Sequence, residues 1–449
     1  MAADAVAAFG DKGGLYHPDY PDHWERGPLY SLAQWVNGLA FRDIQFSASG
    51  MPVIKIAEIK GGISGQTKFT QQTFDDSVRV RAGDLLFSWS GQPETSIDAF
   101  WWRGPEGWLN QHVFRVTPAD GIDPTFFYYL LRYLKPNFVG IARNKQTTGL
   151  GHVTKRDLEN IEAACPEISE QRAIAHVLGT LDDKIELNRR MNETLEAIAR
   201  AIFKSWFVDF DPVRAKAAGR PTGLPKHIAD LFPDSFQDSD LGEIPEGWEV
   251  RELSDLCSTQ YGYTASAVDE PVGPKFLRVT DINKRNWIEW GDVPHCAIEP
   301  DARASYALQV GDLVVARMAD PGKSAIIEEE TDAVFASYLV RLKTPSLAHS
   351  YYVYGFLKSY LYAEYAEGAK SGSVQANMNA KVIVGASLVV PREGVMEQFL
   401  QVVLPLRRRL VANVRQSRTL AALRDALLPK LLSGAIRIKD AARVTREAL

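Results

Sequence analysis

The short stretch Asp-Pro-Gly-Lys-Ser at 320–324 is the part of the sequence that comes nearest to a phosphate-binding loop. A complete loop of that kind has another glycine five positions before its Gly-Lys pair, and its backbone N–H groups surround the phosphates. In this sequence that position is Arg317. We therefore predict a surface turn that binds no nucleotide, in which Lys323 remains available to contact a phosphate of nucleic acid.

The motifs of common catalytic and metal centres are missing. The sequence contains no H-E-x-x-H, C-x-x-C or G-x-S-x-G, and no Asn/Asp-Pro-Pro-aromatic tetrapeptide of the kind that amino-methyltransferases use. Cys165, Cys257 and Cys296 lie far apart and are interpreted as buried thiols. We therefore expect no catalytic residue, no metal site and no cofactor in this chain.

Polar loops rich in glycine carry the side chains best suited to contact nucleic acid. Long basic and amide side chains form paired hydrogen bonds with guanine or adenine edges, and glycine lets the backbone approach phosphates. The candidates in these loops and in the turn are Gln66, Lys68, Arg143, Lys145, Gln146, Thr147, Lys284, Arg285, Asn286, Lys323, Lys370, Ser371, Ser373 and Gln375. Each of these side chains could equally well be exposed only because it is solvated. We therefore predict that the loops, each taken as a whole, contact nucleic acid, and not that any one residue does.

Composition leaves the question of nucleic-acid binding open. The 449 residues are long enough for about two to four domains, and the formal net charge is −5. A nucleic-acid binder usually has a basic excess, but only its contacting face must be basic. No signal peptide and no apolar run long enough to span a membrane occur, so we expect a cytoplasmic protein without membrane contact.

These loops need a scaffold, and the clearest scaffold element is a long helix in the middle of the chain. The segment 181–207 contains no Gly or Pro and repeats apolar residues every seven positions, with one polar residue among them. Its stripe consists of Leu181, Ile185, Asn188, Leu195, Ile198 and Ile202. Such a stripe predicts a coiled-coil seam, which requires a partner helix.

A second segment at 406–434 supplies that partner. Each member of its stripe lies 225 positions after its counterpart in the first, and the polar residue is repeated too. The second stripe consists of Leu406, Leu410, Asn413, Leu420, Leu423 and Leu427. The two segments therefore belong to an internal repeat.

Charge favours pairing between these two helices. Residues 167–209 contain eight acids and six bases, and residues 397–437 contain two acids and eight bases. Opposite net signs favour the mixed pair, although the charges could also be solvated outer faces. We expect an antiparallel pair because it returns the chain to its starting end, and in that arrangement Asn188 and Asn413 should separate toward opposite ends.

The repeat extends over the globular parts as well. Pro21 and Trp24 correspond to Pro245 and Trp248, and the strand and turn at 83–87 correspond to those at 311–315, all at offsets between 223 and 228. The sequence therefore predicts an α+β protein in which two similar mixed α/β domains are joined by two long helices in an antiparallel coiled coil. The expected boundaries are 1–166 for the first domain, 167–210 for the central helix, 211–244 for a linker, 245–391 for the second domain, 392–436 for the distal helix and 437–449 for a tail.

The shared segments resemble those of a known family. EISEQRAIAHVLGTLDDKIELNRRMNETLEAIARAIFKSWFVDFDPV, LFPDSFQDSDLGEIPEGW and RLVANVRQSRTLAALRDALLPKLLSGAI are similar to the central and distal shared regions of specificity subunits of type I restriction–modification systems. The order of parts, with a variable unit, helix, linker, second variable unit and second helix, resembles that family over nearly the whole chain.

The resemblance implies a DNA-recognition subunit with two target recognition domains. Each domain would read one half of a split site in double-stranded DNA, and the coiled coil would act as a spacer. The resemblance also implies two DNA methyltransferase (modification) subunits and restriction/translocase subunits as partners. Catalysis, S-adenosylmethionine, ATP and Mg²⁺ would belong to those partners.

An interpretation from another class remains open at this point. A coiled-coil adaptor or scaffold protein that does not bind DNA would show the same seam and the same repeat. The acidic charge balance favours that alternative, and the glycine-and-amide loops present in both repeats favour DNA.

Overall fold

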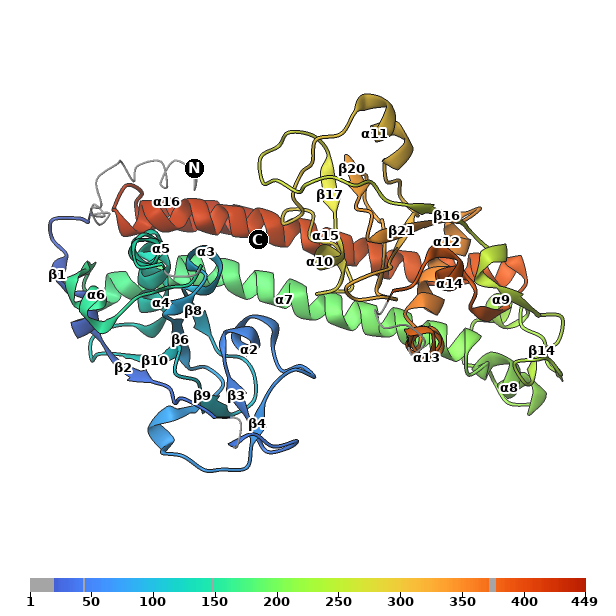
Figure 1. Cartoon of the computed structure of the whole chain (residues 1–449), viewed down its shortest axis with the longest axis horizontal. Coiled ribbons are helices and arrows are strands. Elements are labelled where there is room, and N and C mark those ends of the chain that lie inside the picture. The colour runs from blue at the N-terminus through green and yellow to red at the C-terminus, as the bar shows by residue number, and fades with distance from the viewer. Residues whose placement is uncertain (1–19, 43–44, 147–148, 371–376) are drawn as a thin grey trace. The chain divides into compact units, whose positions relative to one another are not determined.

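The computed structural model describes residues 20–42, 45–146, 149–370 and 377–449 (Figure 1). The chain forms two compact units. The first unit consists of the chain up to Ile185 together with Thr419–Leu449, and the second unit is the continuous segment Glu186–Arg418. Each long helix therefore contributes a part to both units.

The first unit is built on a four-stranded antiparallel sheet. Its order is β2 (Ala33–Asn37), β10 (Val113–Pro118), β6 (Leu85–Ser88) and β8 (Asp98–Trp101). The aromatic helix α4 (Pro124–Tyr133) packs against this sheet with seven buried residues, and α5 (Lys135–Asn144) follows it directly. The core therefore lies between the sheet and the helices, and it includes Leu178 and Leu181 of the first long helix.

Smaller elements complete the first unit. A second sheet has the order β4 (Phe69–Thr70), β3 (Met51–Ile54), β9 (Gly107–Leu109) and β5 (Arg79–Val80). Two strand pairs are β1 (Glu25–Pro28) with β12 (Glu162–Cys165) and β7 (Ser90–Gly91) with β11 (Gly151–His152). Three short helices are α2 (Ile56–Gly61), α3 (Pro93–Ser96) and α6 (Lys155–Asn160).

The second unit repeats the main sheet in the same order and with the same antiparallel pairing. Its strands are β16 (Ser258–Tyr261), β21 (Leu339–Lys343), β18 (Leu313–Ala316) and β19 (Ser324–Ile326). The helices α12 (Leu347–Leu357) and α13 (Tyr360–Lys370) take the places of α4 and α5. The duplication read from the sequence is therefore a duplication of one fold, and the predicted fold class is confirmed.

The remaining elements of the second unit also have counterparts in the first. The pair β15 (Glu249–Glu252) with β22 (Ser387–Val390) is antiparallel like β1 with β12. The pair β17 (Lys275–Leu277) with β20 (Ala333–Phe335) is parallel like β3 with β9. The short helices are α10 (Val279–Ile282), α11 (Pro300–Tyr306) and α14 (Ala380–Val384).

The long helices α7 (Ile168–Phe207) and α15 (Glu393–Leu432) have 40 residues each. In the second unit, Asn192 bonds to Asn413, Glu196 pairs with Arg407, and the Phe203 ring lies 5.9 Å from the Phe399 ring. The residue number falls along α15 as it rises along α7. The helices are therefore antiparallel, as predicted.

The predicted separation of the two asparagines was wrong. In the second unit Asn188 Nδ2 donates a hydrogen bond to the carbonyl oxygen of Asn413, at 3.4 Å. Each asparagine is the twenty-first residue of its 40-residue helix. An antiparallel pair brings helix midpoints together, and the prediction overlooked that both asparagines lie at midpoints.

The predicted linker and tail are folded parts of the two units. The segment 211–244 contains α8 (Asp211–Ala217), α9 (Lys226–Ala229), β13 (Phe236–Gln237) and the first residue of β14 (Ile244–Pro245). Its residues Val213, Ile228 and Phe232 are buried in the core of the second unit. The tail contains α16 (Ile438–Ala448), whose Ala441 is buried in the core of the first unit.

Candidate nucleic-acid interface and helix seam

The first candidate loop follows α2 in the first unit. Gln66 and Lys68 are both exposed. The loop is shaped by a hydrogen bond from the Ser64 N–H to the Thr67 hydroxyl, and the Lys68 carbonyl accepts a bond from the Val53 N–H. The backbone is therefore held by β3 while the two long side chains remain free to reach outward.

The second candidate loop follows α5, and its basic side chains have carboxylate partners. Arg143 pairs with Glu94. Lys145 Nζ lies 2.6 Å from both carboxylate oxygens of Asp157. Gln146 bonds to the carbonyl oxygen of Gly149 at 2.7 Å. These side chains fix the loop, and Thr147 lies outside the described residues.

Asp157 shows the electrostatic consequence of this pairing. Burial of the carboxylate favours its protonated form, but hydrogen bonds from Lys145 and Thr154 outweigh burial and lower the pKa of Asp157. Asp157 also closes the capping box that begins α6 with Thr154. Lys145 therefore has a structural role in the first unit in addition to any contact with a ligand.

In the second unit the candidate residues lie on two loops and one helix end. Lys284 is exposed, and Arg285 pairs with Glu289 at 2.6 Å and stacks over Trp287. The Asn286 side chain accepts a hydrogen bond from Lys358 Nζ at 3.3 Å. Lys370 is the last residue of α13; its side chain and the candidates Ser371, Ser373 and Gln375 lie outside the described residues.

The stretch at 320–324 is a tight turn between β18 and β19, as predicted. Gly322 has a φ of +90°, and its N–H bonds to the Ala316 carbonyl at 3.0 Å. The N–H of Lys323 bonds to the Asp320 carbonyl at 3.2 Å, and the Lys323 side chain is exposed. The turn closes on its own backbone, so its N–H groups are not arranged around a phosphate.

Candidate loops gather around the corresponding strand connection in each unit. In the first unit, Lys60 of α2 bonds to the Thr95 carbonyl and Arg143 of α5 pairs with Glu94, so both loops border α3. In the second unit, Asn286 contacts Lys358, whose pKa is lowered chiefly by burial and also by the charge of Lys323 in the β18–β19 turn. The connection between the last two strands of the main sheet is therefore the centre of each candidate interface.

Most of the predicted seam residues are buried or partly buried within their units. Leu181, Leu420 and Leu427 are buried in the first unit, and Asn188, Leu410 and Asn413 in the second. The partly buried members are Ile185, Leu195, Ile202, Leu406 and Leu423. Ile198 was assigned wrongly, because its side chain is 43% exposed. A helix drifts by about 20° per heptad, and Ala199 and Phe203 take the buried positions there.

The centre of the seam is polar. Asn188 Nδ2 also lies 3.0 Å from Gln416 Oε1 and 3.3 Å from Ser417 Oγ, and Asn413 Nδ2 donates to Asn192 Oδ1 at 2.9 Å. Asn188 Oδ1 is buried without a hydrogen-bond partner among the described residues. A polar group of this kind specifies register at some cost in stability.

Charge pairs join the two helices in each unit. In the first unit Asp182 of α7 pairs with Arg424 of α15, and in the second Glu196 of α7 pairs with Arg407 of α15. Burial disfavours the charge on Arg407, but Glu328, Tyr354 and Glu196 raise its pKa well above the ordinary value. In both units α7 supplies the acid and α15 the base, so these charges are not solvated outer faces.

The cysteines are less uniformly buried than predicted. Cys296 is buried, whereas Cys165 and Cys257 are half-buried. Burial raises the pKa of both half-buried thiols to about 12. They are therefore protonated at neutral pH and poor nucleophiles. No helix in the described part of the chain is both long and apolar enough to cross a membrane.

Comparison with known proteins finds a family match in the first half of the chain. Residues 21–197, which include the first main sheet and most of α7, match the family described as the type I restriction modification DNA specificity domain. This segment is therefore similar to a type I specificity domain. The resemblance to type I specificity subunits is thereby confirmed.

Relatives extend the similarity beyond that domain. The specificity subunit of the type I restriction enzyme MjaIX from Methanocaldococcus jannaschii is 28% identical over 346 residues, covering 74% of this chain and 73% of the relative. That of HindI from Haemophilus influenzae is 25% identical over 419 residues, covering 80% and 87%. The S subunit structure from M. genitalium aligns over 94% of this chain and 98% of that one, with 15% identity and a TM-score of 0.49.

Three charged residues that the motif search missed lie together in the second unit. They are Arg200 of α7, Lys358 after α12 and Arg407 of α15, and all of them line one pocket. Sequence reasoning treated the first and third as ordinary helix charges. Arg200 and Arg407 could have been found by comparing the charged residues at corresponding positions of the two repeats, because the charge changes sign between the repeats at both positions.

Proposed function

We propose that this chain is the DNA-sequence-specificity subunit of a type I restriction–modification complex and recognises a bipartite, gapped site in double-stranded DNA. The observation that carries the proposal is the second unit. It repeats the strand order of the type I specificity domain that residues 21–197 match. Two readers with the same fold and different loops would recognise two different half-sites.

In this proposal the chain is a non-catalytic subunit. It docks two DNA methyltransferase (modification) subunits, and restriction/translocase subunits join the assembly. S-adenosylmethionine, ATP and Mg²⁺ are bound by those partners. The antiparallel helices set the distance between the two half-sites and hence the length of the gap.

Strand-resolved methylome sequencing tests the proposal. A host that expresses the chain with its modification subunits is compared with the same host lacking only the chain. We expect a methylated motif in two parts, separated by unspecified bases, that disappears without the chain. Unchanged methylation would reject the proposal in favour of an adaptor that does not bind DNA.

A paired insertion tests the spacer role of the helices. One heptad is added to α7 beside Asn192 and one to α15 beside Asn413, because these residues face each other. Seven residues lengthen a helix by about 10 Å, which corresponds to about three base pairs. We expect the gap to lengthen or binding to be lost, with unchanged half-sites. Altered half-sites at an unchanged gap would contradict the spacer role.

A further inference from the structure

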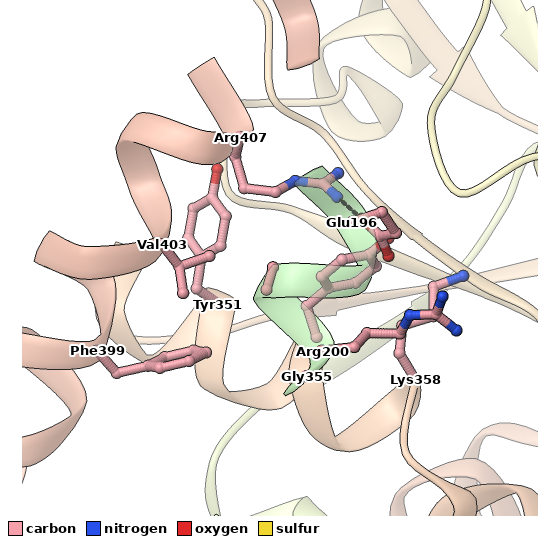
Figure 2. A pocket seen from close by; sticks show the side chains of 10 residues that line it. Glu196, Arg200, Tyr351, Gly355, Lys358, Phe399, Val403 and Arg407 are labelled. Carbon is pink, nitrogen blue, oxygen red and sulfur yellow. Dashed lines mark hydrogen bonds and ion pairs between the residues drawn. The ribbon is translucent and has the colours of Figure 1, made fainter. Parts of the chain in front are cut away.

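A pocket in the second unit lies among α7, α12 and α15. The charged and polar residues along its walls include Glu196, Arg200, Tyr354, Lys358 and Arg407, and its empty volume is about 300 Å³ with open solvent included. Figure 2 shows Arg407 directed at Glu196 and the nitrogen-bearing ends of Arg200 and Lys358 on one side of the pocket. The pocket therefore has one internal ion pair and additional positive groups.

These positive groups lack carboxylate partners within the described residues. Lys358 Nζ bonds to two neutral oxygens, the Ser324 carbonyl at 2.7 Å and Asn286 Oδ1 at 3.3 Å. Arg200 and Lys323 are exposed and form no ion pair there. The nearby acids Glu196 and Glu328 both pair with Arg407. The third N–H donor of Lys358 therefore makes no hydrogen bond within the described residues, although the ammonium lies 5.4 Å from the centroid of the Tyr354 ring.

The electrostatic state of Lys358 reflects this excess of positive charge. Burial is the largest cause that lowers its pKa to about 8; Glu196 opposes the shift, and Lys323, Arg407 and Arg200 add to it. The charged form of a lysine in such surroundings is stabilised when an anion binds nearby.

The first unit has a lysine at the corresponding position, and a carboxylate of the same unit forms an ion pair with it. Lys135 corresponds to Lys358, since each directly follows a Leu at the end of the aromatic helix, Leu134 and Leu357 respectively. Lys135 Nζ lies 2.6 Å from Asp98 Oδ2. Sheet register gives the counterpart of Asp98. Phe87 pairs with Ala99 and the corresponding Val315 pairs with Ser324, so Asp98 corresponds to Lys323.

Two further acids of the first unit are replaced by bases in the second. Asp182 and Arg407 are 225 positions apart, as are Arg200 and Asp425, which is the offset of the two helix stripes. Three repeat positions around the half-buried lysine thus change from acid to base. The first unit pairs its lysine with Asp98, whereas Lys358 has no carboxylate partner in the described part of the second unit.

We propose that Arg200, Lys323 and Lys358 form a binding site for a phosphate group in the second unit. A phosphate has several acceptor oxygens and accepts charge-assisted hydrogen bonds from ammonium and guanidinium groups together. The third N–H donor of Lys358 binds one oxygen inside the pocket, and Arg200 and Lys323 hold the outer oxygens. The phosphate belongs either to a free phosphate compound or to a phosphodiester of DNA. The site itself does not depend on the proposed function.

The test measures the pKa of Lys358 in the full chain by NMR, with lysines carrying ¹³C at Cε. The Lys358 signal is identified by its loss in Lys358→Arg. Inorganic phosphate is added at constant ionic strength, with chloride as the reference, and short duplex DNA is added in a second titration. Lys323→Asp restores the first unit's carboxylate, and Lys381→Gln is a matched control because Lys381 is an exposed lysine of the same unit outside this cluster.

We expect inorganic phosphate to raise the pKa of Lys358 from about 8 toward its ordinary value of 10.5. Lys381→Gln should leave that response unchanged, and Arg200→Gln should weaken phosphate affinity about tenfold. Lys323→Asp should raise the pKa of Lys358 without phosphate and remove the response. A response to the duplex as well identifies a phosphodiester as a source, and a response to inorganic phosphate alone identifies a free phosphate. No response to either probe, or an undiminished response in Lys323→Asp, would overturn the proposal.

Discussion

The two units differ in how deeply they bury the charges that join α7 to α15. In the first unit the side chains of Arg424 and Asp182 are 15% and 22% exposed. In the second, Arg407 is 2% exposed and lies between Glu196 and Glu328, which are 2% and 8% exposed. The repeat therefore preserves the positions of strands and helices while its charges differ in burial and in sign. The second unit should accordingly be more sensitive to changes of charge.

Loss of Arg407 should have the largest effect. Arg407→Met leaves two buried carboxylates unpaired and should lower the free energy of unfolding by about 3–5 kcal/mol. Arg424→Met should cost about 1 kcal/mol, since Asp182 retains access to water and the Tyr129 hydroxyl. Urea denaturation measures the free energy of unfolding of both variants.

Combining Arg407→Met with Glu196→Gln and Glu328→Gln should restore part of the lost stability, because the carboxylates are then neutral. If the two single variants lost equal amounts of stability, the predicted difference between the two units would be wrong.

A methyl group at Gly355 should have the next largest effect. A Cβ there would lie 2.2 Å from Phe203 Cδ2, where α12 approaches α7, whereas the corresponding position in the first unit is Arg132. Gly355→Ala should destabilise the chain by about 1–3 kcal/mol through overpacking. Gly368→Ala, in the neighbouring α13 with space for a Cβ, should instead stabilise by up to about 1 kcal/mol. Thermal unfolding of both variants checks this, and a neutral Gly355→Ala would show that Phe203 can move aside.

The charge difference between the units should also appear as a pH dependence. Glu196 and Arg200 from α7, Arg407 from α15 and Lys323 from the turn surround Lys358, whose pKa is about 8. An anion binds the protonated lysine, so sulfate affinity should be greatest below pH 8 and fall about tenfold by pH 9 as the proton is lost. Sulfate is suitable because it does not titrate in this range. Calorimetry with wild type and Lys381→Gln should give the same profile, and a flat profile would exclude Lys358 from binding.

The smallest expected effect concerns Lys145 in the first unit. Lys145→Gln removes a half-exposed ion pair with Asp157 and should cost less than about 1 kcal/mol, since Thr154 still bonds to Asp157 at the start of α6. If Lys145 also contacts DNA phosphate, the variant should reduce the salt dependence of binding. Binding measured at several salt concentrations, beside urea denaturation, separates the two roles. A larger loss of stability would make Lys145 primarily a structural residue.

The sequence was sufficient for those parts of the fold that depend on periodic apolar residues. Leu181 and Leu427 follow the heptad, and the Gly-Asp turns repeat between the halves, so the helices, their direction and the duplication were predictable. Ile198 was misplaced because a seven-residue repeat drifts from the 3.6-residue turn of a helix.

The candidate interface was less predictable because it depends on pairs distant in sequence. Arg143 and Lys145 carry the expected charge, but their carboxylate partners, Glu94 and Asp157, are supplied by other elements. Lys358 was missed because its surroundings come from α7, α15 and the β18–β19 turn. Local composition identifies basic side chains, and only the fold shows which of them are neutralised.

The division of the chain into units has a consequence for synthesis on the ribosome. The second unit is one uninterrupted segment, Glu186–Arg418, whereas the first closes its core with Leu420, Leu427 and Ala441 from the end of the chain. Domains commonly fold as they emerge, with the N-terminal one first. In this protein we expect the second unit to complete its core before the first. The first unit can complete its core only after α16 has been synthesised. A nascent chain that stalls before α16 therefore exposes apolar residues of that incomplete core.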